Sequence, residues 1–339
     1  MLATYTQGDE PVPGYRLVRM LGWGRFGEVW LARAPGGFEA ALKFIGLGNK
    51  HGIKEYRAIR LFKQLRHPNL VPLNALWLKD KQGNFIDDDV VEDTANLDAQ
   101  AAELILAMGL GDKSLFERLK ECHEQHQPGV PASELLAYTE QVASVLDFLH
   151  RPVHDFGHGP VGLQHCDVKP QNILVVGGSA QICDLGVARV LGDSEASPAM
   201  GSAAYIAPEC ISDGRPSFAS DQYSLAIAYA ELRTGVLPIK ARSIAAAYMA
   251  HLEAKLDLTR LPAAEQEVVR KATALTPVDR FADVCSMAAA LRQAVAKSEL
   301  AAESIPPLDL SDESADDEVD LESDMPRHAA DGPMTIVMR

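Results

Sequence analysis

The first fifth of the chain alternates between short apolar runs and glycine-rich turns. The runs YRLVRMLG, EVWLAR and EAALKFI cover residues 15–22, 28–33 and 39–45, and the turns between them contain GWGRFG and APGG. Runs of this length bounded by Gly and Pro are typical of strands joined by tight turns. The pattern therefore predicts an antiparallel β meander over residues 15–45.

A helical pattern follows the meander. The charged stretch IKEYRAIRLFKQL at residues 53–65 has an apolar residue at every third position, which predicts an amphipathic helix. Residues 79–101 are polar and acidic and are predicted to form a solvated loop or ragged hairpin. A docking surface for a basic partner is the alternative interpretation of this stretch. The apolar run ELILAM at residues 103–108 predicts a further strand.

Beyond residue 112 the pattern is mainly helical. Residues 133–150 have an apolar face at helical spacing. Residues 221–235 are apolar nearly all round and end at a glycine, which is typical of a helix buried at the centre of a domain. Further helices are predicted near residues 243–255, 263–275 and 281–298.

Composition excludes several classes of protein. The chain has 339 residues, 47 % of them apolar, with a net charge of -15 from 47 acidic and 32 basic residues. The apolar share supports a real core, and the acidic balance argues against a nucleic-acid or anionic-membrane binder. No apolar run reaches the length of a membrane span. Residues 1–13, which end in Pro11 and Pro13, are predicted to be a short N-terminal leader without a secretory pattern. Together with five scattered cysteines that form no C-x-x-C pair, this indicates a cytoplasmic protein.

The charge is concentrated at one end. Residues 299–339 hold 12 acidic and two basic residues, so residues 298–339 are predicted to be an acidic disordered tail. The rest of the chain carries a net charge of only -5. The tail finishes with GPMTIVMR, which is interpreted as a docking peptide, as an autophosphorylation target at Thr335, or as a frayed end.

Two elements near the start suit a phosphate-bearing ligand. Gly22, Gly24 and Gly27 form a G-x-G-x-x-G pattern between two predicted strands. A dinucleotide fingerprint would instead open a helix. Strand, loop and strand fit a flap whose backbone amides cover phosphates. Lys43 follows 16 residues after Gly27 on the next predicted strand, where it would place a point charge on those phosphates.

Two further motifs carry the groups that phosphoryl transfer needs. HCDVKPQN contributes Asp167, Lys169 and Asn172, and DLG contributes Asp184, all within 20 residues. One carboxylate would orient the attacking hydroxyl and accept its proton. The second carboxylate and the amide oxygen would hold Mg²⁺, and the lysine would neutralise the transferred group.

At these motifs the chain resembles the eukaryotic-like (bacterial-type) Ser/Thr protein kinases over residues 14–297. The resemblance implies an α+β, two-lobed protein kinase fold. Residues 14–108 would form a small antiparallel β N-lobe with one helix, which the family calls αC. Residues 109–112 would form the hinge, and residues 113–297 a larger, mainly helical C-lobe.

The resemblance also assigns roles to single residues. Gly22, Gly24 and Gly27 would form the Gly-rich loop, and Lys43 would position ATP. Asp167 would be the catalytic aspartate with Lys169 beside it, and Asn172 and Asp184 the metal ligands for Mg²⁺, with Mn²⁺ as an alternative. Further matches are the A-P-E glutamate, the arginine that pairs with it and the aspartate opening the buried helix: Glu209, Arg280 and Asp221.

The adenine site and the αC glutamate follow from the same resemblance. Residues around adenine would be Val29, Ala41, Met108, Gly109, Gly111 and Leu174, with Met108 as gatekeeper and the two glycines bonding through their backbone. Glu55, the only carboxylate in residues 53–66, is predicted to pair with Lys43. It lies 12 residues before His67, about three more than the family spacing, which is nearly one helical turn. The strict register would select Ala58, which cannot pair.

By the same resemblance, Lys169 and Ser202 indicate Ser/Thr specificity, because Ser202 stands where the family has a threonine that contacts the catalytic aspartate and lysine. Cys166 departs from the family. Cys166 replaces the arginine of H-R-D, giving a non-RD (HCD) loop, and a cysteine cannot bind a phosphate bidentately. Activity is therefore predicted not to depend strictly on activation-loop phosphorylation. Neutral drift around a still-basic pocket is the alternative.

The leading function is transfer of the ATP γ-phosphoryl group to Ser/Thr hydroxyls of proteins. A pseudokinase scaffold that binds nucleotide or partners without catalysis is the alternative, and a small-molecule kinase of related fold is a third. The expected partner is a protein substrate, with autophosphorylation or docking through the acidic tail, and neither nucleic acid nor membrane is expected to bind.

Overall fold

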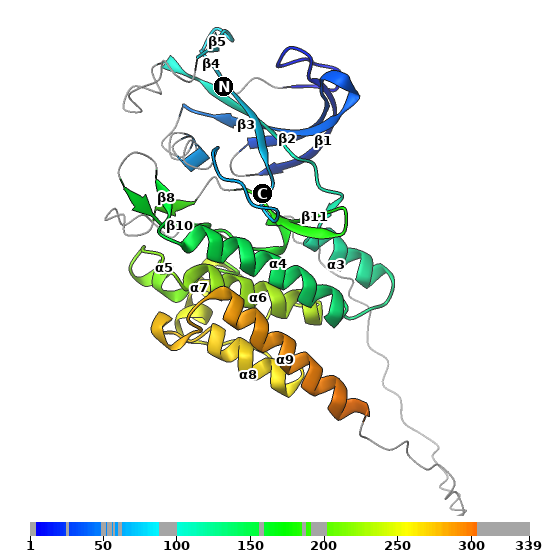
Figure 1. Cartoon of the computed structure of the whole chain (residues 1–339), viewed down its shortest axis with the longest axis vertical. Helices are drawn as coiled ribbons and strands as arrows, with labels where there is room; N and C mark the ends of the chain where they lie inside the picture. Colours follow the sequence, from blue (N-terminus) through cyan, green and yellow to red (C-terminus); the bar gives the residue numbers. More distant parts are fainter. Residues whose placement is uncertain are drawn as a thin grey trace, which may run out of the picture.

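The structure, a computed structural model, describes residues 5–24, 27–48, 52, 56, 58–59, 63–87, 100–155, 159–184, 188–190 and 202–303. The chain folds into a β-rich N-terminal lobe and a helical C-terminal lobe (Figure 1). Glu55, Leu185 and residues 304–339 lie outside the described residues, so the predicted αC partner and most of the predicted tail are not described. Residues 298–303, which were predicted to begin the tail, instead continue the last helix, α9 (Val284–Glu303).

The N-lobe is one six-stranded antiparallel sheet in the order β1-β2-β3-β6-β4-β5. The predicted meander is confirmed, because the first three strands pair in sequence. The strands are β1 (Arg16–Gly24), β2 (Gly27–Arg33), β3 (Glu39–Gly46), β4 (Leu73–Lys79), β5 (Phe85–Ile86) and β6 (Glu103–Met108). The predicted acidic loop begins as the short β4–β5 hairpin, and residues 88–99 lie outside the description.

Strand β3 distributes its side chains to two faces. Leu42 and Phe44 are buried in a cluster on one face with Leu17. Ile45 is buried on the other face against Tyr56 and other residues of the predicted helix at 53–65. Because successive side chains of a strand alternate, Lys43 shares the face of Ile45. The sheet thus sends the lysine toward the predicted active site.

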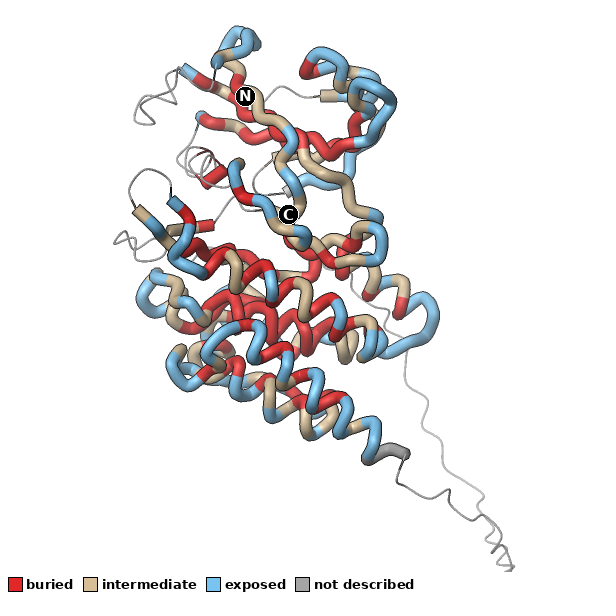
Figure 2. The backbone as a smooth tube through the Cα atoms, viewed as in Figure 1, coloured by how far each residue is buried: buried red, intermediate tan, exposed pale blue. Residues whose placement is uncertain are grey.

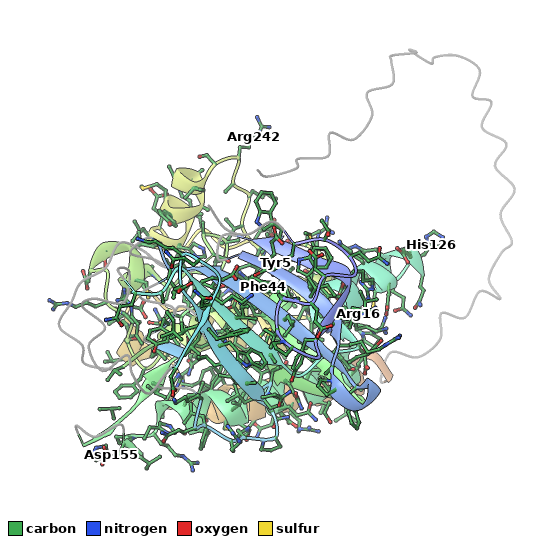
Figure 3. All side chains as sticks on the ribbon, turned by 90° about the horizontal axis from the view of Figure 1, so that it is seen from above. Tyr5, Arg16, Phe44, His126, Asp155 and Arg242 are labelled. Carbon is green, nitrogen blue, oxygen red and sulfur yellow. The ribbon has the colours of Figure 1, made fainter. Side chains whose placement is uncertain are left out.

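The segment before β1 packs on the sheet from Tyr5 onward. The Tyr5 ring packs on Phe44 with centroids 4.3 Å apart (Figure 3). Its hydroxyl donates to Glu103 Oε2 at 2.6 Å. Lys79 Nζ donates to the Pro11 carbonyl at 2.6 Å. The residues predicted as a leader therefore cover one face of the N-lobe sheet, at least from Tyr5 to Pro11.

Helices build the C-lobe around α6 (Ser220–Thr234), of which every residue from Ser220 to Leu232 is buried. Figure 2 shows this run of buried residues between the other helices. Helix α6 ends at Gly235, whose φ of 78° is the left-handed geometry that glycine adopts freely. The other helices are α3 (Leu115–Glu124), α4 (Ala132–His150), α5 (Pro208–Ser212), α7 (Ile244–Leu252), α8 (Ala263–Ala272) and α9 (Val284–Glu303).

Short strands lie in the segment between α4 and α5, and one more, β7, lies directly before α3. They are β7 (Lys113–Ser114), β8 (His154–Asp155), β9 (Pro160–Val161), β10 (Leu163–Gln164), β11 (Ile173–Val176), β12 (Ser179–Ile182) and β13 (Arg189–Val190). The β11–β12 hairpin pairs with β7, and β10 pairs with β13. The HCDVKPQN motif spans the connection from β10 to β11, and the DLG aspartate follows β12 after one residue, Cys183. Within the described ranges, no helix has both the length and the apolarity to cross a bilayer.

Candidate active site

Asp167 is the centre of the polar network in the loop between β10 and β11. Its Oδ2 accepts hydrogen bonds from Lys169 Nζ at 2.7 Å and from Asn172 Nδ2 at 3.0 Å. Its backbone carbonyl also accepts from Asn172 Nδ2, at 2.8 Å. The carboxylate is 5 % exposed, so these bonds hold one orientation. The Asp167 carboxylate is thus fixed by its own loop.

Ser202 completes this network from a distant part of the chain. Its N–H and its hydroxyl both donate to Asp167 Oδ1, at 2.9 and 3.0 Å. Lys169 Nζ also donates to Ser202 Oγ, at 2.8 Å. An aspartate, a lysine and a serine therefore form a closed triangle. The predicted contact of Ser202 with the aspartate and the lysine is confirmed.

Lys43 reaches the DLG aspartate across the two lobes. Its Nζ lies 2.7 Å from Asp184 Oδ1, and the lysine side chain is 8 % exposed. Burial raises the pKa of the Asp184 carboxyl, but the charge and hydrogen bond of Lys43 outweigh it, so the pKa lies below its usual value. Asp184 is therefore ionised at neutral pH, as a cation ligand must be.

Asn172 and Asp184 are joined through the backbone. The N–H of Cys183 donates to the Asn172 carbonyl at 2.9 Å, which brings Asp184 next to Asn172. Because Asn172 Nδ2 donates to Asp167, the side-chain oxygen is the group of Asn172 that could bind a cation. A carboxylate and an amide oxygen are hard donors of the kind that Mg²⁺ prefers. The pair fits a magnesium site.

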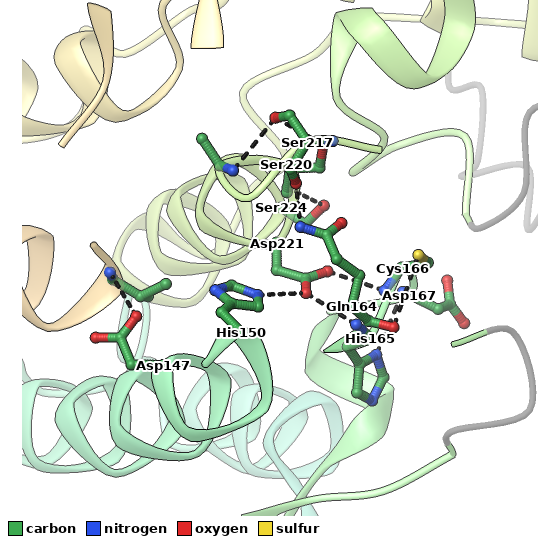
Figure 4. Close-up of polar contacts among 12 residues, drawn as sticks. Asp147, His150, Gln164, His165, Cys166, Asp167, Ser217, Ser220, Asp221 and Ser224 are labelled. Carbon is green, nitrogen blue, oxygen red and sulfur yellow. Dashed lines mark hydrogen bonds and ion pairs between the residues drawn. The ribbon is translucent and has the colours of Figure 1, made fainter. Parts of the chain in front are cut away.

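Asp221, at the start of α6, holds the backbone of the loop that carries Asp167. Its Oδ2 accepts from the His165 N–H and the His150 ring at 2.9 Å each, and its Oδ1 accepts from the Cys166 N–H at 2.9 Å (Figure 4). Burial opposes ionisation, but the hydrogen bond and charge of His150 lower the pKa of Asp221 overall. Cys166 has a φ of 64°, so this loop is held in an uncommon backbone conformation.

The His165 ring joins the two motifs. Its Nδ1 accepts from the Asp167 N–H at 3.3 Å, so the Nε2 that faces the Cys183 carbonyl at 2.9 Å must donate. This assigns a neutral imidazole with its proton on Nε2. The His165 ring therefore joins the loop that carries Asp167 to the segment after β12 that carries Asp184.

The predicted adenine residues also come together. Ala41 pairs with Met108 between β3 and β6. The Gly109 N–H donates to the Pro72 carbonyl at 3.0 Å, so only the Gly109 carbonyl remains for a base. A Cβ on Gly111 would lie 2.8 Å from the Leu174 Cβ, so this glycine lies directly against Leu174.

The glycine-rich loop is described at its two ends. Gly22 and Gly24 lie in β1 and pair with Val29 and Gly27 of β2. Gly27 has a φ of 130°, and a Cβ there would lie 1.7 Å from the Phe44 carbonyl oxygen. The close approach of β2 to β3 at this point therefore requires glycine.

The predicted partnership of Glu209 and Arg280 is confirmed. The guanidinium donates to both carboxylate oxygens, at 2.9 and 2.7 Å. Ser217 and Ser220 also donate to Glu209 Oε1. Arg280 is 4 % exposed, so this is a buried and fully bonded pair that fixes α5 against the end of α8.

Two site residues were not among those predicted. His150 bonds Asp221, and the only local signal was its place at the end of an apolar helix. His251 of α7 donates from Nε2 to the Ala203 carbonyl at 3.0 Å and accepts from the Tyr223 hydroxyl at 2.7 Å. Both contacts join elements far apart in sequence, so no motif signals them.

Residues 15–287 match the protein kinase domain family. The chain belongs to the protein kinase family. This assignment agrees with the two-lobed α+β architecture and with the order of the motifs predicted from the sequence. The kinase domain covers every described residue of the site.

The chain is similar to serine/threonine-protein kinases of bacteria, of a plant and of a primate. PknD of Mycobacterium tuberculosis is 28 % identical over 300 residues, covering 84 % of this chain and 40 % of PknD. PknH of Mycobacterium bovis is 28 % identical over 301 residues, covering 83 % of this chain and 44 % of PknH. PknL of Mycobacterium tuberculosis is 36 % identical over 139 residues, covering 38 % of this chain and 35 % of PknL. The chain thus spans less than half the length of these relatives.

Proposed function

We propose that this kinase transfers the γ-phosphoryl group of ATP to serine or threonine hydroxyls of proteins. The observation that carries the proposal is the network on Asp167, in which both carboxylate oxygens are held by Lys169, Asn172 and Ser202. A carboxylate oriented this closely beside an ion-paired Lys43 and Asp184 is the arrangement that phosphoryl transfer requires.

Each residue of the site has a step in this chemistry. Asp167 would orient the substrate hydroxyl and take its proton as the hydroxyl oxygen bonds to the γ-phosphorus. The bond from that phosphorus to the bridging oxygen of ADP breaks in the same displacement. Lys169 would neutralise charge on the transferring oxygens, and Lys43 would hold the α- and β-phosphates. Mg²⁺, held by Asn172 and Asp184, would withdraw charge from the phosphates.

The nucleotide would lie against the strands that carry Ala41 and Met108. The Gly109 carbonyl and the Gly111 backbone would bond the adenine edge, with Ala41 and Leu174 on its two faces. This assignment is supported by the pairing of Ala41 with Met108 and by the contact of Gly111 with Leu174. Val29 and the glycines of the β1–β2 turn would cover the phosphates.

Ser/Thr specificity and a non-RD mode of control are part of the proposal. The Ser/Thr pattern assigned to Lys169 and Ser202 is supported by the hydrogen bond between them. Both side chains also bond directly to Asp167. Burial raises the pKa of the Cys166 thiol well above its usual value, so the side chain is neutral at physiological pH. A neutral thiol cannot bind a phosphate as an arginine does. We expect activity without obligatory activation-loop phosphorylation, in a reducing cytoplasm where all five cysteines stay free.

A radiolabelled-ATP assay on a generic protein substrate tests the activity. Asp167→Asn should lower turnover by about 10²- to 10⁴-fold, the usual contribution of a general base. Lys43→Met should also abolish transfer. If the unaltered chain binds Mg-ATP but gives neither substrate transfer nor autophosphorylation, the scaffold alternative replaces the proposal.

Phosphosite mapping after incubation with Mg-ATP tests the finer statements. Phosphate should occur on serine and threonine and not on tyrosine. Ser194→Ala combined with Ser197→Ala should retain most of the activity. If that double variant is inactive and phosphomimetic residues restore it, the non-RD statement is wrong while the kinase activity stands.

A further inference from the structure

The outward face of helix α7 is apolar. Ile244 is 62 % exposed and Met249 is 51 % exposed, and Ala245 and Ala246 are exposed beside them. No charged residue occurs from Ile244 to Ala250. Since 23 % of the chain is charged, an uninterrupted apolar face on a surface helix indicates a place where another polypeptide segment packs. We call Ile244, Ala245, Ala246 and Met249 the α7 face.

The inward side of α7 is fixed to the active-site segment. Ala247 and His251 are buried, and His251 donates to the Ala203 carbonyl at 3.0 Å. Ala203 directly follows Ser202, which bonds Asp167. A segment seated on the α7 face is therefore attached to a helix whose buried side contacts the catalytic network.

The charges around α7 favour an acidic occupant. Residues 232–252 contain three cations, Arg233, Lys240 and Arg242, and no aspartate or glutamate. The first two are paired with carboxylates of neighbouring segments. Arg242 is exposed, extends away from the ribbon (Figure 3) and lies two residues before Ile244. The α7 face therefore has a cation at the edge where the helix begins.

The same chain contains a segment of matching chemistry. Residues 334–338 read MTIVM, with four large apolar side chains, and follow residues 304–333, which hold ten acidic residues and a single basic one. We propose that the apolar segment 334–338 docks on the α7 face of its own chain, with the acidic run drawn toward Arg242. The proposal does not rest on catalytic activity.

Chain length permits this contact. The thirty residues from 304 to 333 can span at most about 100 Å when extended, at roughly 3.3 Å per residue. A domain of about 270 residues has a radius of gyration of roughly 18 Å, so α7 is within reach of a chain that leaves α9 at Glu303. A covalent link also gives the segment a local concentration of order millimolar, so modest affinity suffices.

Photo-crosslinking in the 339-residue chain tests the contact. A photoreactive benzoylphenylalanine replaces Ile336, and mass spectrometry maps the products after irradiation. We expect crosslinks to peptides that contain residues 244–249, and we expect Ile244→Ser combined with Met249→Ser to lower their yield at least tenfold. Val278→Ser, at an 87 % exposed apolar residue outside the α7 face, is the matched control and should leave the yield unchanged.

Two additional crosslinking experiments test whether another polypeptide occupies the α7 face. The crosslinks should form within one chain when isotopically light and heavy chains are mixed, and they should persist in the Asp167→Asn chain. Crosslinks between light and heavy chains would assign the α7 face to a second copy and overturn the proposal. Crosslinks that map elsewhere, or that survive the Ile244 and Met249 substitutions, would also overturn it.

Discussion

Ser202 donates its N–H and its hydroxyl to the same oxygen of Asp167, Oδ1, at 2.9 and 3.0 Å. The second oxygen is held by Lys169 and Asn172. Residues separated by more than thirty positions thus share the orientation of one carboxylate. The loop that carries Asp167 therefore directly contacts Ser202, which lies a few residues before the A-P-E motif.

Removing the Ser202 hydroxyl should reduce catalysis, because it loosens the Asp167 carboxylate. Ser202→Ala loses one bond to Asp167 and one from Lys169, and hydrogen bonds to charged groups contribute about 1.5–3 kcal/mol each. We expect turnover to fall at least tenfold in steady-state kinetics, with the KM for ATP nearly unchanged. Ser202→Thr keeps the hydroxyl and should retain activity. Equal activity of the alanine and threonine variants would contradict this role.

Gly27 should be far less tolerant of substitution than Gly22. Its φ of 130° is nearly exclusive to glycine, and a Cβ would overlap the Phe44 carbonyl oxygen. Gly27→Ala should cost at least about 1–3 kcal/mol in urea unfolding and should raise the KM for ATP.

Gly22→Ala is the matched control for that experiment. No atom lies within 4 Å of a Cβ built at Gly22, and its φ is not positive. Alanine there should leave the unfolding free energy unchanged or slightly higher, because glycine has the greater freedom in the unfolded chain. Similar losses at both positions would show that the Phe44 contact is not the cause.

Much of this architecture could be predicted from local sequence. Strand β6 has the predicted bounds. Both ends of helix α6 were predicted within one residue, because Gly235 marks its end and apolar residues occur on nearly all its sides. Asp167, Asn172 and Asp184 could also be predicted from the local sequence. Their chemistry requires fixed residue types at short spacing, so the motif is visible without the fold.

Other features depend on contacts that local patterns do not contain. Tyr5 packs on Phe44 and bonds Glu103, 98 positions away, so its segment could only be interpreted as a leader. His150 and His251 act through Asp221 and Ala203 on other elements. The local sequence does not show whether a histidine side chain is exposed or completes a buried hydrogen-bond network.

The buried pair of Arg280 and Glu209 should contribute strongly to stability. Arg280→Met would leave the Glu209 carboxylate, whose side chain is 10 % exposed, without its cation. Breaking one partner of a buried pair costs about 3–5 kcal/mol, a large part of the stability of a typical domain. We expect this loss in urea unfolding, with a smaller loss for Arg280→Lys.

An exposed ion pair provides the comparison. Arg292 and Glu140 also form a two-bonded pair, but the arginine side chain is 58 % exposed. Arg292→Met should change stability by no more than about 1 kcal/mol. Glu209→Gln combined with Arg280→Met should recover part of the loss, since no carboxylate remains unpaired. A loss at Arg292 as large as that at Arg280 would refute the burial argument.

His251 should make folding stability depend on pH below about 6.5. Burial lowers the pKa of its imidazole from 6.5 to about 4, so the folded state keeps it neutral where the unfolded state binds a proton. The unfolded chain therefore binds more protons between pH 4 and 6.5, and stability rises with pH across that window and is level above it. The free energy of unfolding changes by about 1.4 kcal/mol for each pH unit in this window, so its total change reaches about 3 kcal/mol.

The comparison with His251→Gln isolates this contribution. Glutamine can still donate to the Ala203 carbonyl and accept from Tyr223, but it does not titrate in this range. The raised pKa values of Glu103 and Glu231 act in the opposite direction, but both proteins share them and they cancel in the difference. From pH 7 to pH 4 the unaltered chain should lose up to about 3 kcal/mol relative to the glutamine variant in urea unfolding. Parallel stability profiles would mean that His251 carries no net proton linkage.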